Sequence, residues 1–177
     1  MEIRSETRLH HPVERVFAAY RDQMHEVAEF VPDIREITVQ SRVVDGDMVK
    51  LHNEWVSDRD VPKVASKIIK PEHLRWDDYA EWNSATHTCQ WTIKLRAFTD
   101  AVDCKGQTEL RPVAGEPGET LIVLKGNLNI DLREIPGVPS FLGKRLAPQV
   151  EKFIVSLITP NLERTNAALG RFLDSQG

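Results

Sequence analysis

The chain has 177 residues, 41% of them hydrophobic and 28% charged, which excludes a disordered protein and predicts a single domain over residues 1–177. Its 23 basic and 27 acidic residues nearly balance, and no basic cluster is long enough to follow a phosphate backbone, so we expect no nucleic-acid partner. The apolar runs fall far short of the ~20 residues of a membrane span, and the N-terminus lacks the plan of a signal peptide, which indicates a cytoplasmic protein.

The N-terminal part of the chain reads as a strand followed by a helix. Residues 3–9 alternate between apolar or small and charged side chains, the pattern of a half-buried strand. Pro12 stands where a first helical residue belongs, and apolar residues recur every three or four positions over 13–27. The sequence Phe30-Val31-Pro32 ends this helical region.

The middle of the chain predicts six or seven consecutive strands joined by short turns, which implies an antiparallel meander with one face on a core. After the first strand we expect strands at 34–43, 48–57, 73–82, 86–97, 102–112 and 120–132. Asp45-Gly46 is a strong hairpin signal, and the turn residues at 115–118 mark another turn. Segment 58–72 contains two prolines and is ambiguous, either a strand edge or a loop with a short strand at 64–69.

The last third of the chain predicts a loop and then one long helix. Residues 133–143 are rich in proline and glycine and indicate a loop. Residues 146–173 carry an apolar stripe on one side of a helix, and Pro148 could mark its true start. Pro160 lies inside the pattern, where it lacks an N–H for the carbonyl of Ser156 and should bend the helix.

This order of elements resembles the helix-grip superfamily, which includes START lipid-transfer domains, birch-pollen-allergen-like proteins, polyketide cyclases and coenzyme Q-binding proteins. The segment PVERVF at 12–17 looks like the strand-to-helix junction of that superfamily, and EFVP at 29–32 looks like its passage into the second strand. The resemblance implies an α+β fold in which a curved antiparallel sheet of six or seven strands wraps around the C-terminal helix. It also implies a cavity between the two that takes apolar ligands.

Three polar residues interrupt the otherwise apolar inner faces of the predicted strands. Asn53, His87 and Thr108 are either buried groups satisfied by neighbouring backbone, or, for Asn53 and His87, groups that hold the polar end of a ligand. Four tryptophans fall within 37 residues, as core filler or as an aromatic wall at a cavity mouth. The predicted ligand-binding residues are Asn53, Trp55, Trp76, His87, Trp91, Leu128, Phe153 and Leu157.

The acidic residues and the cysteines do not form a pattern that indicates a catalytic or metal site. Asp77 and Asp78 cannot easily meet, because neighbouring residues on a strand face opposite ways, so a run of solvated charges with Glu81 is the favoured interpretation. Cys89 and Cys104 should be reduced core residues, although they could lie opposite one another in a hairpin. No spacing of histidines or cysteines indicates a metal site, and no motif indicates a cofactor.

The sequence therefore predicts a protein that binds or transports a hydrophobic small molecule, such as a lipid, an isoprenoid or a polyketide-like compound. One alternative is a cyclase or aromatase that uses His87, Asn53 and Asp78 to hold a carbonyl or move a proton. Another is a module whose groove takes a protein segment. Phe141 and Leu142, followed by Lys144 and Arg145, could touch a membrane surface transiently, or they are solvated loop residues. The oligomeric state does not follow from the sequence.

Overall fold

A computed structural model describes the backbone of the whole chain except residues 62, 64–65, 67–68 and 135–139, and the side chains of 132 and 140–147 also lie outside the description. The described residues form one antiparallel sheet of seven strands in the order β1-β7-β6-β5-β4-β3-β2. The strands are β1 (Glu2–Leu9), β2 (Ile34–Asp45), β3 (Met48–Ser57), β4 (Arg75–Asn83), β5 (Thr88–Leu95), β6 (Val102–Val113) and β7 (Glu116–Ile130).

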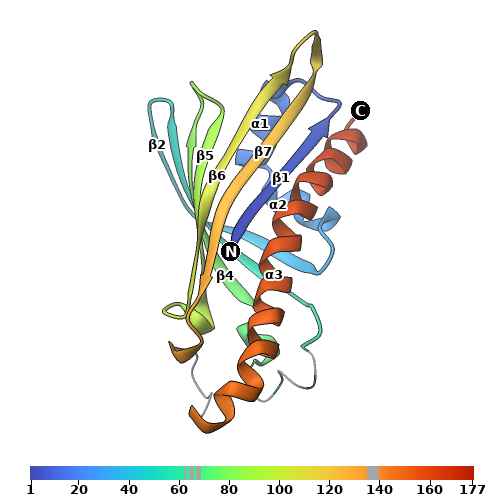
Figure 1. Cartoon of the computed structure of the whole chain (residues 1–177). Coiled ribbons are helices and arrows are strands. Elements are labelled where there is room, and N and C mark those ends of the chain that lie inside the picture. Colours follow the sequence, from blue (N-terminus) through green and yellow to red (C-terminus); the bar gives the residue numbers. More distant parts are fainter. Residues whose placement is uncertain (62, 64–65, 67–68, 135–139) are drawn as a thin grey trace.

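The helices lie on either side of the run of strands from β2 to β7 in the sequence. The short helices α1 (Val13–Asp22) and α2 (Met24–Val27) follow β1, and the long helix α3 (Ser140–Ser175) ends the chain. Single turns of 3-10 helix occupy Ala28–Phe30, Pro71–His73, Arg96–Phe98 and Leu132–Glu134. Figure 1 shows the sheet curving around α3, which lies along its open side. The predicted helix-grip fold is confirmed.

Strand alternation explains which side of the sheet meets the helix. Val49, Leu51, Asn53 and Trp55 on β3 are all buried, as are the odd-numbered residues from Cys89 to Leu95 on β5. Apart from the polar Asn53, these residues belong to one continuous apolar cluster that also contains buried residues of α1 and α3. Burial of this shared apolar face is what holds the helix against the sheet.

The structure moves the ends of several predicted elements. The helix α3 begins at Ser140, so Pro148 lies inside it and does not mark its start, and the predicted loop ends earlier than expected. Strand β7 begins at Glu116, because the hairpin pairs Glu116 with Val113 and leaves only the two-residue turn of Ala114 and Gly115. The short strand expected at 64–69 lies largely outside the described residues.

Pro160 lies inside α3, as the sequence indicates. The Ser156 carbonyl, which therefore lacks a helical donor, accepts a hydrogen bond from a side chain instead. Arg59, which follows β3, donates from Nη1 to the Ser156 carbonyl oxygen at 2.5 Å. The same guanidinium lies 5.8 Å from the centre of the Phe153 ring. Arg59 thereby connects the end of β3 to the middle of the helix. No described helix is long and apolar enough to cross a membrane.

The two cysteines are free and buried, in agreement with the prediction of reduced core residues. The idea that they could lie opposite one another is wrong. In the register of β5 and β6, Cys89 pairs with Thr108 and Cys104 pairs with Ile93. The connection between the strands follows Leu95 and includes the turn of 3-10 helix at Arg96–Phe98, which sets this register.

Candidate functional site

A cavity lies between the inner face of the sheet and α3. Its empty space, including the part open to solvent, is about 670 Å³, of which about 70 Å³ is free for the centres of water-sized molecules. A single buried water needs only about 10–15 Å³ of space for its centre, so several atoms of a small molecule fit without any movement of the walls. The lining residues are Tyr20, Trp55, Trp76, Asp78, Ala80, Trp82, Cys89, Trp91, Ile93, Thr108, Leu124, Leu157, Ile158, Asn161, Leu162 and Thr165.

All four tryptophans of the chain line this cavity and are also buried in the core. Trp55 and Trp76 are paired across β3 and β4, and their rings stack with centroids 5.8 Å apart. Trp82 packs nearly perpendicular to the Phe17 ring of α1, with ring centroids 5.3 Å apart. The two readings of the tryptophans, as core filler and as an aromatic wall, therefore describe the same side chains.

Trp91 lies over a pair of glycines that leave room for its ring. The register places Trp91 beside Gly106 and Gly106 beside Gly126 on three neighbouring strands. A Cβ atom on Gly106 would come within 2.4 Å of the Trp91 ring, and one on Gly126 within 2.6 Å. The indole N–H donates to Thr108 Oγ1 at 3.1 Å. The glycines and Thr108 thus fix the position of Trp91, which lines the cavity.

Asp78 is the acidic group of the cavity wall. Its Oδ2 accepts a hydrogen bond from Asn53 Nδ2 at 3.2 Å, and no described lysine, arginine or histidine forms an ion pair with it. Burial raises the pKa of Asp78 to about 6, opposed by the Asn53 amide and the nearby Trp55 indole. The Trp55 N–H is buried and has no partner with hydrogen-bond geometry among the described residues. A half-buried carboxyl of this kind can hold or release a proton near neutral pH.

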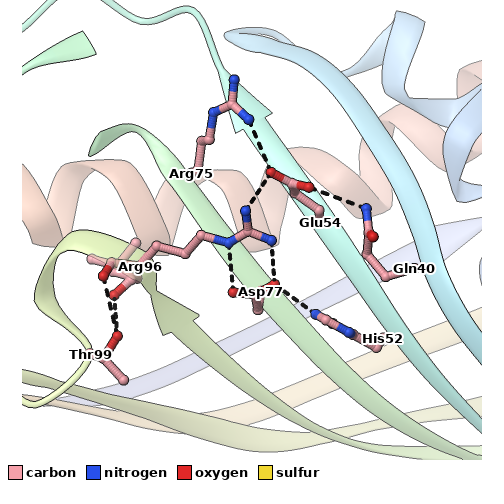
Figure 2. Close-up of polar contacts among 8 residues, drawn as sticks. Gln40, His52, Glu54, Arg75, Asp77, Arg96 and Thr99 are labelled. Atoms are coloured by element: carbon pink, nitrogen blue, oxygen red, sulfur yellow. Dashed lines mark hydrogen bonds and ion pairs between the residues drawn. The ribbon is translucent and has the colours of Figure 1, made fainter. Parts of the chain in front are cut away.

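Asp77, one residue earlier, faces the outer side of the sheet and belongs to a network of ion pairs (Figure 2). His52 Nε2 lies 2.6 Å from Asp77 Oδ1, and Arg96 makes two contacts of 2.9 Å with the same carboxylate. Arg96 and Arg75 also bind Glu54 at 2.9 and 3.2 Å. The hydrogen bonds from Arg96, and then from His52, lower the pKa of Asp77.

The outer network confirms that Asp77 and Asp78 do not meet. The interpretation of Asp77, Asp78 and Glu81 as solvated charges holds for Glu81, which is exposed and pairs with Lys50 at 3.2 Å. It is wrong for Asp78, because Trp76, Asp78, Ala80 and Trp82 share the face of β4 that lines the cavity.

Polar groups on the helices complete the wall, and sequence reasoning did not single them out. Asn161 Nδ2 donates to the Leu157 carbonyl at 2.7 Å, and Thr165 Oγ1 donates to the Asn161 carbonyl at 2.7 Å. From α1, the Tyr20 hydroxyl donates to Asn166 Oδ1 at 3.0 Å. Asn161 and Thr165 are one helical turn apart on the apolar side of α3, which is the signal that could have identified them.

The predicted ligand-binding residues divide into three groups by their place in the structure. Trp55, Trp76, Trp91 and Leu157 line the cavity. Asn53 is buried behind Asp78 and orients it. Leu128 and Phe153 are buried in the core beyond the cavity lining.

His87 lies outside the cavity, and the prediction that it points inward is wrong. It belongs to the turn before β5, with a φ of 50°, and its Nε2 lies 3.2 Å from Glu14 Oε2 while its ring packs on Phe17. The predicted strand started two residues too early, so the alternation was carried into a turn. The side chains of Phe141 and Leu142 lie outside the described residues, and membrane contact there stays a prediction.

A curved antiparallel sheet that wraps a long C-terminal helix and keeps an aromatic cavity between them defines the START and polyketide cyclase-like class of fold. Within this class, residues 4–169 match the family described as "Protein of unknown function (DUF2505)", and the chain belongs to that family. No curated protein matches the chain.

Among the solved structures that are similar to this chain, three match it over most of their own lengths. The protein TTHA0849 from Thermus thermophilus is 18% identical with a TM-score of 0.67, covering 100% of this chain and 99% of that one. The Zhui aromatase/cyclase from Streptomyces sp. R1128 is 13% identical with a TM-score of 0.69, covering 100% and 96%. Norcoclaurine synthase from Thalictrum flavum is 12% identical with a TM-score of 0.58, covering 98% and 86%. At these identities the similarity concerns the fold.

Proposed function

We propose that the protein binds a compact, largely apolar small molecule in the cavity between the sheet and α3. The observation that carries the proposal is the concave wall of four indole rings with a few fixed polar groups, which is the usual composition of a small-molecule site. Burying about 200 Å² of ligand hydrocarbon would contribute about 5 kcal/mol at ~25 cal/mol per Å². The limited free space favours a ring-containing ligand over a lipid with two long chains.

A fluorescent probe tests this proposal without knowledge of the natural ligand. We expect the neutral dye 1-N-phenylnaphthylamine to bind saturably with one site per chain and to increase in fluorescence. Ala80→Leu should weaken binding at least about tenfold, because Ala80 lines the cavity and the larger side chain occupies it. Thr92→Leu, on the outer face of β5, is the matched control and should bind the dye as the wild type does.

The binding proposal fails if the folded wild type shows no saturable binding, or if Ala80→Leu binds the dye as tightly as Thr92→Leu does. Native mass spectrometry of the purified protein provides a second readout. A co-purifying adduct of small-molecule mass that is lost in Ala80→Leu supports a natural occupant of this cavity.

Asp78 favours a second candidate, an enzyme of the cyclase or aromatase type that moves a proton at the ligand. A carboxylate with a pKa of about 6 in an apolar cavity is suited to act as a general base near neutral pH. Turnover of a polyketide-like substrate should rise as the pH increases through about 6, and Asp78→Asn should abolish it while dye binding persists. Turnover that survives Asp78→Asn would exclude this role.

A further inference from the structure

The described part of the cavity wall carries an acidic group and no basic group. Among the described lining residues, Asp78 is the only one that is charged near neutral pH. The other titratable lining groups are Tyr20 and Cys89, and burial raises the pKa of both, which keeps them uncharged. No described lysine, arginine or histidine contributes to the wall. An anionic ligand would meet repulsion here with no compensating cation.

Among the described residues, cationic side chains pair with the outer carboxylate and none pairs with the inner one. Asp77 accepts hydrogen bonds from Arg96 and His52, whereas the described partner of Asp78 is the neutral amide of Asn53. A carboxylate taken out of water without a partner of opposite charge is costly, so the cavity has a position that a cation would stabilise.

Two indole rings lie next to that position. Trp76 lies two residues before Asp78 on the same face of β4, and Trp55 lies two residues after Asn53 on β3. The register pairs Asn53 with Asp78 and Trp55 with Trp76, so the carboxyl and the stacked indoles are adjacent in the wall. Indole is the aromatic side chain that attracts cations most strongly, and the attraction increases when the cation is desolvated.

We propose that the ligand of this cavity is an apolar, ring-containing amine whose positively charged nitrogen pairs with Asp78 beside the Trp55 and Trp76 rings. This inference rests on the proposed binding function and deepens it, because it names the chemical class of the ligand. The nitrogen provides the missing cation, the two indoles lie beside it, and the hydrocarbon fills the space against α3.

Three probes of similar shape test the inference by isothermal titration calorimetry: 3-phenylpropylamine, neutral butylbenzene and anionic 4-phenylbutanoate. We expect the amine to bind at least about tenfold more tightly than butylbenzene and the carboxylate to bind most weakly. Asp78→Asn should remove the preference for the amine and leave butylbenzene binding unchanged. Asp77→Asn, the neighbouring carboxylate on the outer face, is the matched control and should retain the preference.

A pH series in the wild type keeps the test independent of any variant's folding. Affinity for the amine should fall about tenfold between about pH 7 and pH 5 as Asp78 takes up a proton, while butylbenzene affinity stays constant. The titratable groups that face Asp78 are Tyr20 from α1 and Cys89 from β5, and the described lining residues of α3 are uncharged. His52 lies on the outer face of β3 beside Asp77 and acts on Asp78 only through its charge. His52→Gln should leave the pH dependence in place.

The outcomes separate the two proposals. Butylbenzene and the amine binding equally well, or an amine preference that survives Asp78→Asn, overturns the inference and leaves the binding function standing. Absence of binding for all three probes and for 1-N-phenylnaphthylamine overturns the binding function itself.

Discussion

Asp77 and Asp78 show how far one residue position changes the chemistry of a side chain. Both are aspartates of β4, yet one faces the arginines of the outer surface and the other faces the indoles of the cavity. Their pKa values move in opposite directions, down for Asp77 and up to about 6 for Asp78. Because a pKa difference between folded and unfolded chains changes stability, the two residues should affect unfolding with opposite signs.

Asp78→Asn should stabilise the protein at about pH 7.5 by about 1–2 kcal/mol and have little effect near pH 4. The raised pKa means that the folded protein keeps a proton that the unfolded chain releases. Stability is therefore lost as the pH rises from the ordinary value of 3.8 through about 6, and asparagine does not incur that loss. Urea unfolding of both proteins at the two pH values measures the difference. Equal stabilisation at both pH values would contradict this explanation.

Asp77→Asn should do the reverse and destabilise the protein by about 1 kcal/mol at about pH 7.5. The lowered pKa means that Asp77 contributes stability above its ordinary pKa of 3.8, and that this contribution disappears as the pH falls through the folded value. The same urea series checks it. A stabilising effect of Asp77→Asn near neutral pH would show that the outer network is unfavourable.

At the scale of elements, the middle of α3 depends on a residue from outside the helix. Pro160 cannot donate to the Ser156 carbonyl, and Arg59 does so instead. Buried backbone acceptors are nearly always paired. Arg59 thus donates to a carbonyl that has no helical donor because of the proline. This contact also fastens the end of β3 to the helix that closes the cavity.

A double-mutant cycle tests whether Arg59 compensates for Pro160. Arg59→Ala should cost about 1–3 kcal/mol in the wild type, the usual effect of removing a hydrogen bond made by a charged group. In a Pro160→Ala background the cost should be clearly smaller, because the new N–H at 160 can bond the Ser156 carbonyl. Denaturant unfolding of the four proteins gives the coupling energy. A coupling near zero would mean that Arg59 acts through other contacts.

The glycine pair under Trp91 is the second element-scale feature that shapes the cavity. Gly126→Ala should destabilise the protein by about 1–3 kcal/mol, because its Cβ would lie 2.6 Å from the Trp91 ring and 2.9 Å from the Lys105 carbonyl oxygen. Gly118→Ala is the matched control on the same strand and should be nearly neutral, since nothing lies within 4 Å of its Cβ. Thermal unfolding compares the two. Equal effects would show that Trp91 shifts without cost.

At the scale of the whole molecule, one apolar cluster connects α1, α3 and the inner face of the sheet. A single core of this kind predicts that residues 1–177 unfold as one unit. Tryptophan fluorescence, which reports the cavity, and far-ultraviolet circular dichroism, which reports all elements, should show the same urea midpoint. Separate midpoints would mean that α3 detaches from the sheet before the sheet unfolds.

The sequence by itself determined the order of elements, the inner faces of most strands and the class of fold. Each of these depends on short-range patterns, such as the alternation in β3 and β5 or the apolar stripe of α3, which are visible in neighbouring residues. The same patterns identified Trp55, Trp76, Trp91 and Leu157, which line the cavity. They failed at His87, where a strand was extended into a turn.

Only the tertiary structure decided which polar groups meet. Asp78, Tyr20, Asn161 and Thr165 come from a strand and two helices, and they line one cavity because the sheet curves around α3. The charge of Asp78 depends on that burial, and the orientation of Trp91 depends on glycines of the next two strands. The periodicity of the sequence predicts on which face of its strand or helix a side chain lies. Strand register, sheet curvature and helix packing determine which residues lie opposite that face.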